Sequence, residues 1–408
     1  MPYARENRRG SGPARLLGTL ARLAAHGGPA WITVAASLAL SLLSVYAIDV
    51  AVSLHAPVGL DLAPTAIRQL IFVAAGFVAA VAICIPHYRT LGACSWVLMG
   101  AALMLLLFLL LPFVPASIVR PRNGARAWID VGPVDLQPSE LAKIAYVLVL
   151  AWYLRFRRNH RTFRGLLPPA LITGLPVALI MLQPDLGTAS LFVPALFAVL
   201  LAAGAKLKHL ALVVCLAAAA APAAYPLLKP HQKQRIVGLL LQVRGDTRAD
   251  QDINMQSVTA QRLVGAGGLT GAGDAHARTL LHFNALPERH TDMIFAVLCT
   301  RFGLLGGAAV LALYIAWAAG ALLTAAVCRE PFGRLVIVGL VGFIATQVFI
   351  NVGMNLGIVP IIGITLPFVS HGGSSMLTVW LMTGLILSIA LRQASMPLRR
   401  SFEYADDE

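Results

Sequence analysis

The stretch LPERHTDMIFAVLCTRFG, residues 286–303, joins a dense row of polar residues directly to an apolar run. The run begins at Met293 and continues to about residue 325, whereas a helix needs only about 20 apolar residues to cross a bilayer. Nine further runs could span a membrane, at residues 30–53, 65–85, 91–115, 138–154, 166–182, 187–205, 208–228, 333–356 and 374–393. The sequence therefore predicts an all-α polytopic integral membrane protein with about ten transmembrane helices in one bundle. Because the fourth, fifth and sixth runs are short and interrupted by Pro, eight to ten spans are compatible with it.

The composition excludes a soluble globular domain. Of the 408 residues, 58% are hydrophobic and only 12% are charged, whereas soluble domains carry about 25% charged residues. The five cysteines lie in or beside apolar runs without the spacing of metal ligands. We therefore predict apolar packing, rather than a disulfide framework or a zinc site, for Cys84, Cys94, Cys215, Cys299 and Cys328.

The formal net charge of +14 is explained by membrane topology rather than by a nucleic-acid partner. Clusters of Lys and Arg precede the first run and follow the fourth, sixth and last runs, which places them on one side of a ten-span chain. Arg120, Arg122 and Arg126 break this pattern. We predict that both termini are cytoplasmic and that no signal peptide is cleaved. The predicted parts are a basic arm at residues 1–29, a membrane domain at 30–393 with a large external loop at 229–291 between helices 7 and 8, and a tail at 394–408.

The segments of unusual composition all fall on the predicted external side, at residues 121–143, 181–190, 229–291 and 351–375. In the last of them Gly and Pro crowd into chain that is otherwise apolar enough to enter the membrane. Non-helical backbone at that depth is tolerated only where protein buries it or a water-filled cavity receives it. The segment is either a broken, re-entrant element or a Gly-rich loop packed closely against neighbouring helices.

In QPSELAK, residues 137–143, Pro138 suits the first turn of a helix, and Glu140 and Lys143 share one face. A charged side chain inside a span costs on the order of 3 kcal/mol unless it is paired or hydrated. Lys143 could be neutralised by Glu140, snorkel outward or serve a ligand. Arg126 and Trp128 lie just upstream, and two cations beside an aromatic side chain favour a phosphate-bearing ligand.

Two further carboxylates have competing interpretations. Asp185, in QPDLGTAS, precedes an apolar run and is predicted from residue type to be a helix N-cap. Thr291 or Asp292 could cap the eighth span in the same way. One cap is enough, however, and five polar residues occur together at 288–292. A carboxylate in a partly dry site can also serve as a general base, which is the alternative for Asp292.

The segment GAGGLTGAG, residues 265–273, superficially resembles a phosphate-binding loop. It lacks a following Lys-Ser/Thr pair and any βαβ context, so we predict a flexible external turn instead.

Taken together, these segments resemble the RodA/FtsW family of shape, elongation, division and sporulation proteins. The resemblance extends from Asn123 to Ser375. It is carried by NGARAWIDVGPVDLQPSELAK, QPDLGTA, HQKQRI, GGLTGAG, LPERHTDMIFAV and NVGMNLGIVPIIGITLPFVSHGGSS. Any one of these motifs is weak evidence, but their order over more than half the chain is specific.

The resemblance implies a peptidoglycan glycosyltransferase of the bacterial cytoplasmic membrane. Such an enzyme polymerises lipid II into glycan strands at the outer face, for cell elongation or division, and releases undecaprenyl pyrophosphate. A class B penicillin-binding protein is the implied partner. Asp292 is the implied catalytic base, and the implied substrate-binding residues are Arg126, Trp128, Glu140, Lys143, Asp185, His290, Ser370 and Ser374. A divalent cation, Mg²⁺ or Mn²⁺, is compatible with this chemistry, but no ligand cluster in the sequence locates it.

Four residues depart from the family pattern. Thr300 and Arg301 stand where an acidic pair is usual, Ala272 replaces a Lys, and His371 replaces a Tyr. Two alternatives to the enzyme stay open: a lipid II flippase or transporter, which needs the same polar cavity and cations, and a non-catalytic scaffold that recruits the penicillin-binding protein, which the departures make plausible. Replacing Asp292 by Asn separates the enzyme from both, since only polymerisation requires a base at the external face.

Overall fold

The computed structural model describes residues 27–55, 62–115, 117–119, 121, 125–132, 135–157, 159–227, 233–234, 237–238, 240–241, 244 and 254–393. Most of the predicted basic arm, the predicted tail and HQKQRI in large part lie outside the described residues. The helices are α2 (Ala30–Val52), α3 (Pro64–Ile83), α4 (Tyr88–Ala93), α5 (Ser95–Leu110), α6 (Pro138–Leu154), α7 (Leu167–Leu182), α8 (Leu186–Ala202), α9 (Leu207–Ala224), α11 (Met255–Ala266), α12 (Asp274–Phe283), α13 (Ile294–Val327), α14 (Pro331–Asn355) and α15 (Gly373–Gln393).

The predicted all-α membrane fold is confirmed, since each of the ten predicted runs is helical. Six of these helices are long and apolar enough to cross a membrane, and three shorter apolar helices lie among the described residues as well. The only strands in the described chain are β1 (Ile129–Asp130) and β2 (Asp135–Leu136), which form an antiparallel pair. The number of spans and the sidedness of the loops stay predictions.

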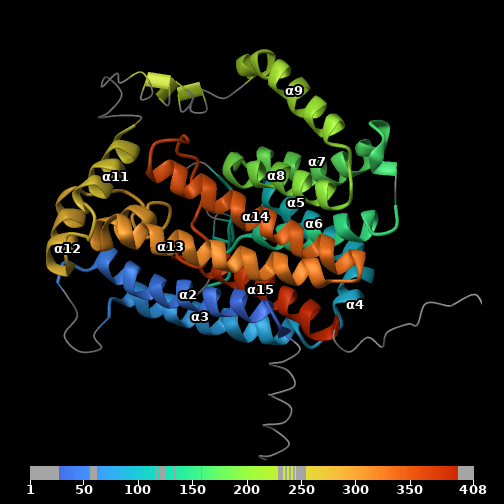
Figure 1. Cartoon of the computed structure of the whole chain (residues 1–408). Helices are drawn as coiled ribbons and strands as arrows, with labels where there is room; N and C mark the ends of the chain where they lie inside the picture. Colours follow the sequence, from blue (N-terminus) through green and yellow to red (C-terminus); the bar gives the residue numbers. More distant parts are fainter. Residues whose placement is uncertain are drawn as a thin grey trace, which may run out of the picture.

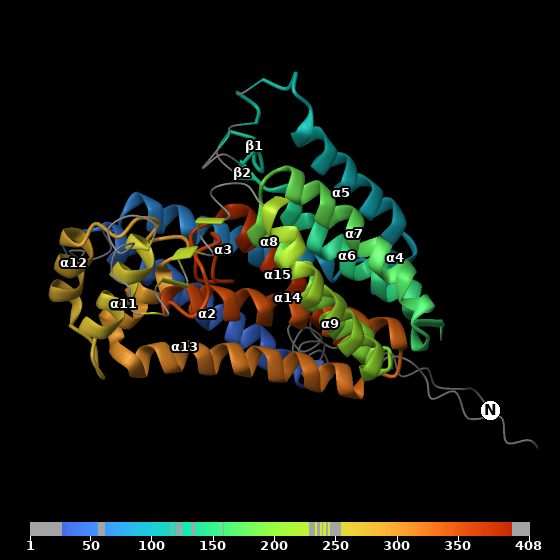
Figure 2. The same cartoon turned by 90° about the horizontal axis from the view of Figure 1, so that it is seen from above.

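Most of the helices pack as one bundle, with α11 and α12 together at one end of it, whereas α9 projects from it (Figure 1). Within it α13 lies along α2, α15 along α3, and α14 along both α8 and α13. Figure 2 shows α5, α6 and α7 grouped on the side of the bundle away from α12. Polar side chains connect the packed helices: Trp317 of α13 donates to Ser37 Oγ of α2 at 3.0 Å, and Ser37 bonds Thr383 of α15 at 3.0 Å. In an apolar solvent such hydrogen bonds add specificity to helix contacts.

The segment after α14 enters the bundle as non-helical chain. Ile364, Leu366, Phe368 and Val369 are all at most 4% exposed. The Phe368 ring contacts Trp317 of α13 and Trp380 of α15, which are deep positions in their helices. The structure shows non-helical chain packed closely among helices, which both interpretations made from the sequence predict.

Helix α13 is interrupted at Gly303, whose backbone is non-helical. The freed N–H groups of Leu304 and Leu305 donate to Gly268 O at 2.9 Å and Leu269 O at 3.1 Å, and Thr300 O accepts from Ala272 N at 3.0 Å. The prediction of a flexible turn at 265–273 is therefore wrong. The segment is held by main-chain hydrogen bonds to the break in α13. Glycine is required there, because a Cβ on Gly271 would lie 2.2 Å from Arg301 O and its φ is +93°.

We expect Gly271→Ala to destabilise the protein by about 1–3 kcal/mol or more, because it combines strained backbone with a clash against main chain. The thermal unfolding midpoint of the purified protein in detergent measures the effect. Gly265→Ala is the matched control, since an added Cβ at this α11 position meets nothing within 4 Å. Alanine is also the better helix former, so equal losses from the two variants would contradict this account.

Candidate active site

A cavity of about 730 Å³ opens where α3, α6, α8 and α15 begin. The 286–293 segment and the buried non-helical segment before α15 close its other side. Of the site residues predicted from sequence, six line this cavity: Trp128, Glu140, Asp185, His290, Asp292 and Ser374. Residues more than 240 positions apart in the chain thus share one space.

The main chain at Asp292 is held by side chains of α14. Asn351 Nδ2 and Asn355 Nδ2 donate to Asp292 O at 2.8 and 3.1 Å. Asn355 Oδ1 accepts from Ala296 N at 3.1 Å, and so serves the first turn of α13. The N-cap position of α13 is Met293, rather than Thr291 or Asp292, and has no side-chain cap. The Asp292 carboxylate lines the cavity, and a Cβ added to Gly363 would lie 3.4 Å from its Oδ2.

Ser370 supports the same segment and does not line the cavity. Its hydroxyl donates to Thr291 O at 2.6 Å and accepts from Leu366 N at 2.7 Å. One residue on, His371 N donates to His290 O at 2.9 Å. Ser370 therefore supports the 286–293 segment by hydrogen bonding to its main chain, from outside the cavity lining. Ser374 does line the cavity, where its Oγ accepts from Gln137 N at 3.1 Å.

Glu140 and Lys143 form a buried ion pair, with Nζ 2.8 Å from Oε1. The Lys143 side chain is 1% exposed, so the snorkelling alternative is wrong. Lys143 Nζ also donates to Gln347 Oε1 at 3.4 Å, and it lies behind Glu140 rather than in the cavity lining. The second oxygen of Glu140, Oε2, is buried without a hydrogen-bond partner among the described residues. Glu140 itself is among the residues that line the cavity.

Asp185 combines both interpretations made from the sequence. Its Oδ1 accepts from Thr188 N at 2.9 Å, so the predicted N-cap of α8 is confirmed. Its Oδ2 accepts from Gln137 Nε2 at 3.4 Å, and the residue lines the cavity. Burial raises the pKa of this carboxyl group.

Arg126 is not brought into the cavity lining. Its Nη2 donates to Val114 O at 3.2 Å, and its Nε is buried with no partner in the described chain. The cation that does line the cavity is Arg68 of α3, which the sequence prediction does not include. The sequence did indicate Arg68, because it lies inside the apolar run 65–85. A charged residue in a membrane span faces the bundle interior or a water-filled cavity by default. Gln347, Asn351 and Asn355 are also absent from the prediction, although their spacing of four places them on one face of α14.

The departures at Thr300 and Arg301 lie away from the cavity. Thr300 Oγ1 donates to Leu263 O at 3.1 Å and Ala296 O at 2.8 Å. Arg301 Nε donates to the Tyr46 hydroxyl at 2.7 Å and to Asp274 Oδ1 at 3.3 Å. Both residues are thus accommodated by local partners. His371, in contrast, lines the cavity, with its ring centroid 5.8 Å from that of His290.

No group of three or more His, Cys, Asp or Glu residues could hold a metal ion in the part of the chain that the structure describes. The divalent cation considered from the sequence therefore has no site assigned to it.

The family model of the cell cycle proteins FtsW, RodA and SpoVE matches residues 29–395. The chain belongs to this family. It is 34% identical over 325 residues to the stage V sporulation protein E of Bacillus subtilis, across 79% of this chain and 86% of that protein. It is 37% identical over 277 residues to the peptidoglycan glycosyltransferase MrdB of Escherichia coli, across 65% and 71% of the two chains.

Two solved structures share the fold of this FtsW/RodA/SpoVE protein. A chain of a peptidoglycan synthase complex, described as coordinating polymerization and crosslinking, has a TM-score of 0.73 at 29% identity, covering 90% of this chain and 98% of that one. The rod shape determining protein RodA of Thermus thermophilus has a TM-score of 0.63 at 29% identity, covering 89% and 97%. With its apolar helices and its family, this chain is a multi-pass protein of the bacterial cytoplasmic membrane.

The histidine that lines the cavity makes stability depend on pH. Burial, together with the positive charge of His290 and Arg68, lowers the pKa of His371 from 6.5 to about 4. Between pH about 6.5 and about 4, His371 is protonated in the unfolded chain but neutral in the folded chain. The free energy of unfolding therefore decreases as pH falls through this range. We expect His371→Gln to reduce the fall in unfolding midpoint across this range. His276→Gln, at an exposed position on α12, is the control and should track the wild type; identical slopes for all three proteins would contradict the assignment.

Proposed function

We propose that this chain is a peptidoglycan glycosyltransferase that polymerises lipid II into glycan strands at the outer face of the cytoplasmic membrane, for cell elongation or division. The observation that carries the proposal is the cavity, which gathers Asp292, Trp128 and Arg68 in one space. The relative from Escherichia coli is named a peptidoglycan glycosyltransferase, which supports the same reaction class.

In the proposed reaction a hydroxyl oxygen of the acceptor sugar attacks the anomeric carbon of the donor. Asp292 takes the hydroxyl proton as the new C–O bond forms, and the bond from the anomeric carbon to the pyrophosphate oxygen breaks. Undecaprenyl pyrophosphate leaves with that electron pair. A general base in this position typically contributes about 10²–10⁴-fold to the rate. The amide donors on Asp292 O support the assignment, because a base must be held in place to act on a bound hydroxyl.

The pyrophosphate gains negative charge in the transition state, and a preorganised cation stabilises it. Arg68 fits this role better than the two cations predicted from sequence. It lines the cavity, whereas Lys143 is neutralised by Glu140 and Arg126 bonds a carbonyl outside the lining. Trp128 lines the same cavity, where an aromatic side chain suits contact with a sugar ring. Glu140 also lines the cavity, where a carboxylate suits a hydroxyl or amide of the acceptor sugar.

We further propose a class B penicillin-binding protein as the partner that crosslinks the new strand. The similar chain from a peptidoglycan synthase complex supports this pairing.

Asp292→Asn should reduce polymerisation at least about 10²-fold, because the amide keeps the shape of the carboxylate but accepts no proton. The measurement is glycan-strand formation from purified lipid II by the protein reconstituted with its penicillin-binding partner. Asp130→Asn, on β1 and outside the cavity lining, is the control and should stay within about twofold of wild type. Equal polymer from Asp292→Asn and wild type, with partner binding intact, would remove Asp292 from the mechanism.

Arg68→Gln should weaken binding of undecaprenyl pyrophosphate more than tenfold and lower turnover by about 10²-fold, as loss of one charge-stabilising donor does elsewhere. Competition by added undecaprenyl pyrophosphate during polymerisation measures the first effect. Arg68→Lys keeps the charge and should recover part of both. Unchanged inhibition by the pyrophosphate in Arg68→Gln would exclude Arg68 as its ligand.

A further inference from the structure

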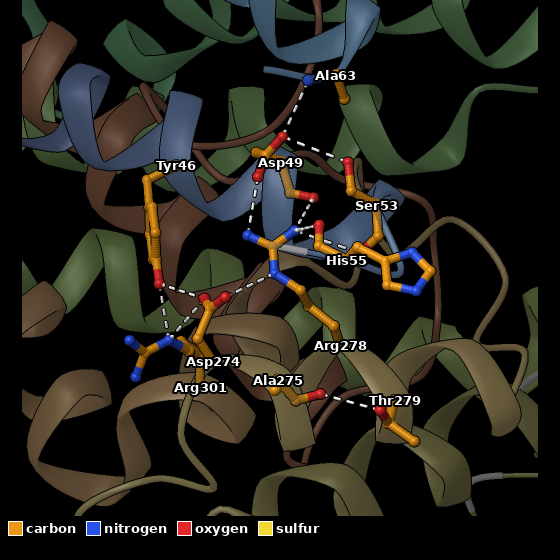
Figure 3. A network of polar contacts seen from close by, with 10 residues as sticks. All are labelled: Tyr46, Asp49, Ser53, His55, Ala63, Asp274, Ala275, Arg278, Thr279 and Arg301. Atoms are coloured by element: carbon orange, nitrogen blue, oxygen red, sulfur yellow. Dashed lines mark hydrogen bonds and ion pairs between the residues drawn. The ribbon is translucent and has the colours of Figure 1, made fainter. Parts of the chain in front are cut away.

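A second polar cluster lies away from the cavity, between α12 and the end of α2 (Figure 3). Its centre is Arg278 of α12, which is 1% exposed. Arg278 Nη2 donates to Asp49 Oδ2 at 2.8 Å, and Nε donates to Asp274 Oδ2 at 2.9 Å. Nη1 lies 3.1–3.3 Å from the carbonyl oxygens of Asp49, Ser53 and His55. One guanidinium therefore serves two carboxylates and three main-chain acceptors.

Three main-chain carbonyls converge on Arg278 where α2 ends: that of Asp49, which also accepts from Ser53 N, and those of Ser53 and His55, which follow the helix. The guanidinium that binds them belongs to a helix more than 220 residues later in the chain. The Asp49 carboxylate extends the connection, since its Oδ1 accepts from Ala63 N at 3.0 Å, directly before α3. The ends of α2 and α3 and the body of α12 are thus joined through one buried ion pair.

A second, more exposed ion pair joins α12 to α13. Asp274 Oδ1 accepts from the Tyr46 hydroxyl at 2.7 Å and from Arg301 Nε at 3.3 Å. Although burial acts to raise it, the hydrogen bonds from Tyr46 and Arg278 lower the pKa of Asp274, so the carboxylate is ionised at neutral pH. The side chains of Arg301 and Asp274 are 24% and 26% exposed, and this pair is correspondingly weaker than the one at Asp49.

Only two residues separate the end of α12 from the 286–293 segment, so the position of α12 constrains that segment. The helix ends at Phe283, and the segment that carries Asp292 begins at Leu286, which is 3% exposed. Arg289 Nη1 of that segment donates back to Leu281 O of α12 at 2.9 Å. The segment is therefore held on one side by α12 and on the other by the amides of α14.

We infer that Arg278 is a positioning residue for polymerisation: by fixing α12 against the end of α2, it sets the place of the 286–293 segment and of the Asp292 carboxylate. The inference rests on the function proposed for Asp292. Contact between apolar faces alone would hold α12 nearby but would allow it to slide, whereas the five acceptors around Arg278 fit one register only. A displacement of about 1 Å at a reacting group can cost about 10²-fold in rate.

Arg278→Lys is the decisive variant, because it keeps the buried charge while one ammonium group cannot reach all five acceptors. Arg262→Lys, at an exposed position on α11, makes the same chemical change as a matched control. Both are compared with wild type, as full-length protein with its penicillin-binding partner, for kcat and KM on lipid II. Hydrogen exchange of residues 286–293 is measured in parallel.

For Arg278→Lys we expect kcat to fall about tenfold or more with KM within about twofold, since the cavity lining is unchanged. Exchange at 286–293 should be faster, while exchange in α14 and all properties of Arg262→Lys stay as in wild type. If Arg278→Lys does not fold, Asp49→Asn removes the α2 carboxylate and leaves Arg278 its other acceptors, with the same expectations.

Unchanged exchange at 286–293 would overturn the inference, and so would faster exchange with wild-type kcat. A lower unfolding midpoint with unchanged kcat would also reduce Arg278 to a structural residue. Asp292→Asn in the same assay separates the two proposals. Full activity of Asp292→Asn would refute the base, whereas an inactive Asp292→Asn beside a fully active Arg278→Lys would refute only the positioning role.

Discussion

Non-helical backbone inside the bundle has to find hydrogen-bond partners, and the site depends on how α14 supplies them. Gln347, Asn351 and Asn355 are spaced four apart on one face and are at most 2% exposed. They donate to Thr365 O, Ile364 O and Asp292 O, the carbonyls of two irregular segments. An unpaired buried group costs about 1–3 kcal/mol, so these amides make an otherwise costly backbone possible. The segments they support are those that close the cavity.

The same constraint explains the break in α13. At Gly303 the helix gives up its own hydrogen bonds, and the 265–273 segment replaces them with main-chain groups. The segment that makes these bonds connects α11 to α12, and Arg278 and Asp274 join α12 to α2 and α13. Main-chain hydrogen bonds set where the connection between α11 and α12 contacts α13. The ion pairs of Arg278 and Asp274 then set the register of α12 against its neighbours.

The sequence predicted that Arg126 and Lys143 bind a phosphate-bearing ligand, but neither cation lines the cavity. Lys143 neutralises Glu140 outside the cavity lining, burial raises the pKa of Asp185, and the cationic Arg68 of α3 lines the cavity. The two carboxylates have different surroundings. Asp292 is held through its main-chain carbonyl, whereas the Asp185 carboxylate itself caps α8. Carboxylates in different surroundings can take different roles in one site.

The sequence by itself determined the all-α membrane fold, the ten helical runs and six of the residues that line the cavity, because apolar length and short motifs are local properties. It also indicated the cap at Asp185, which needs only neighbours in the chain. The packing of the helices was needed to show that Arg68 rather than Arg126 lines the cavity, that the Ser370 hydroxyl supports the 286–293 segment, and that main-chain groups of 268–272 bond the break in α13. Each of these depends on how the chain packs against a partner tens to hundreds of residues away. Periodicity predicts that a helix forms, but the packing of the bundle decides which side chains meet.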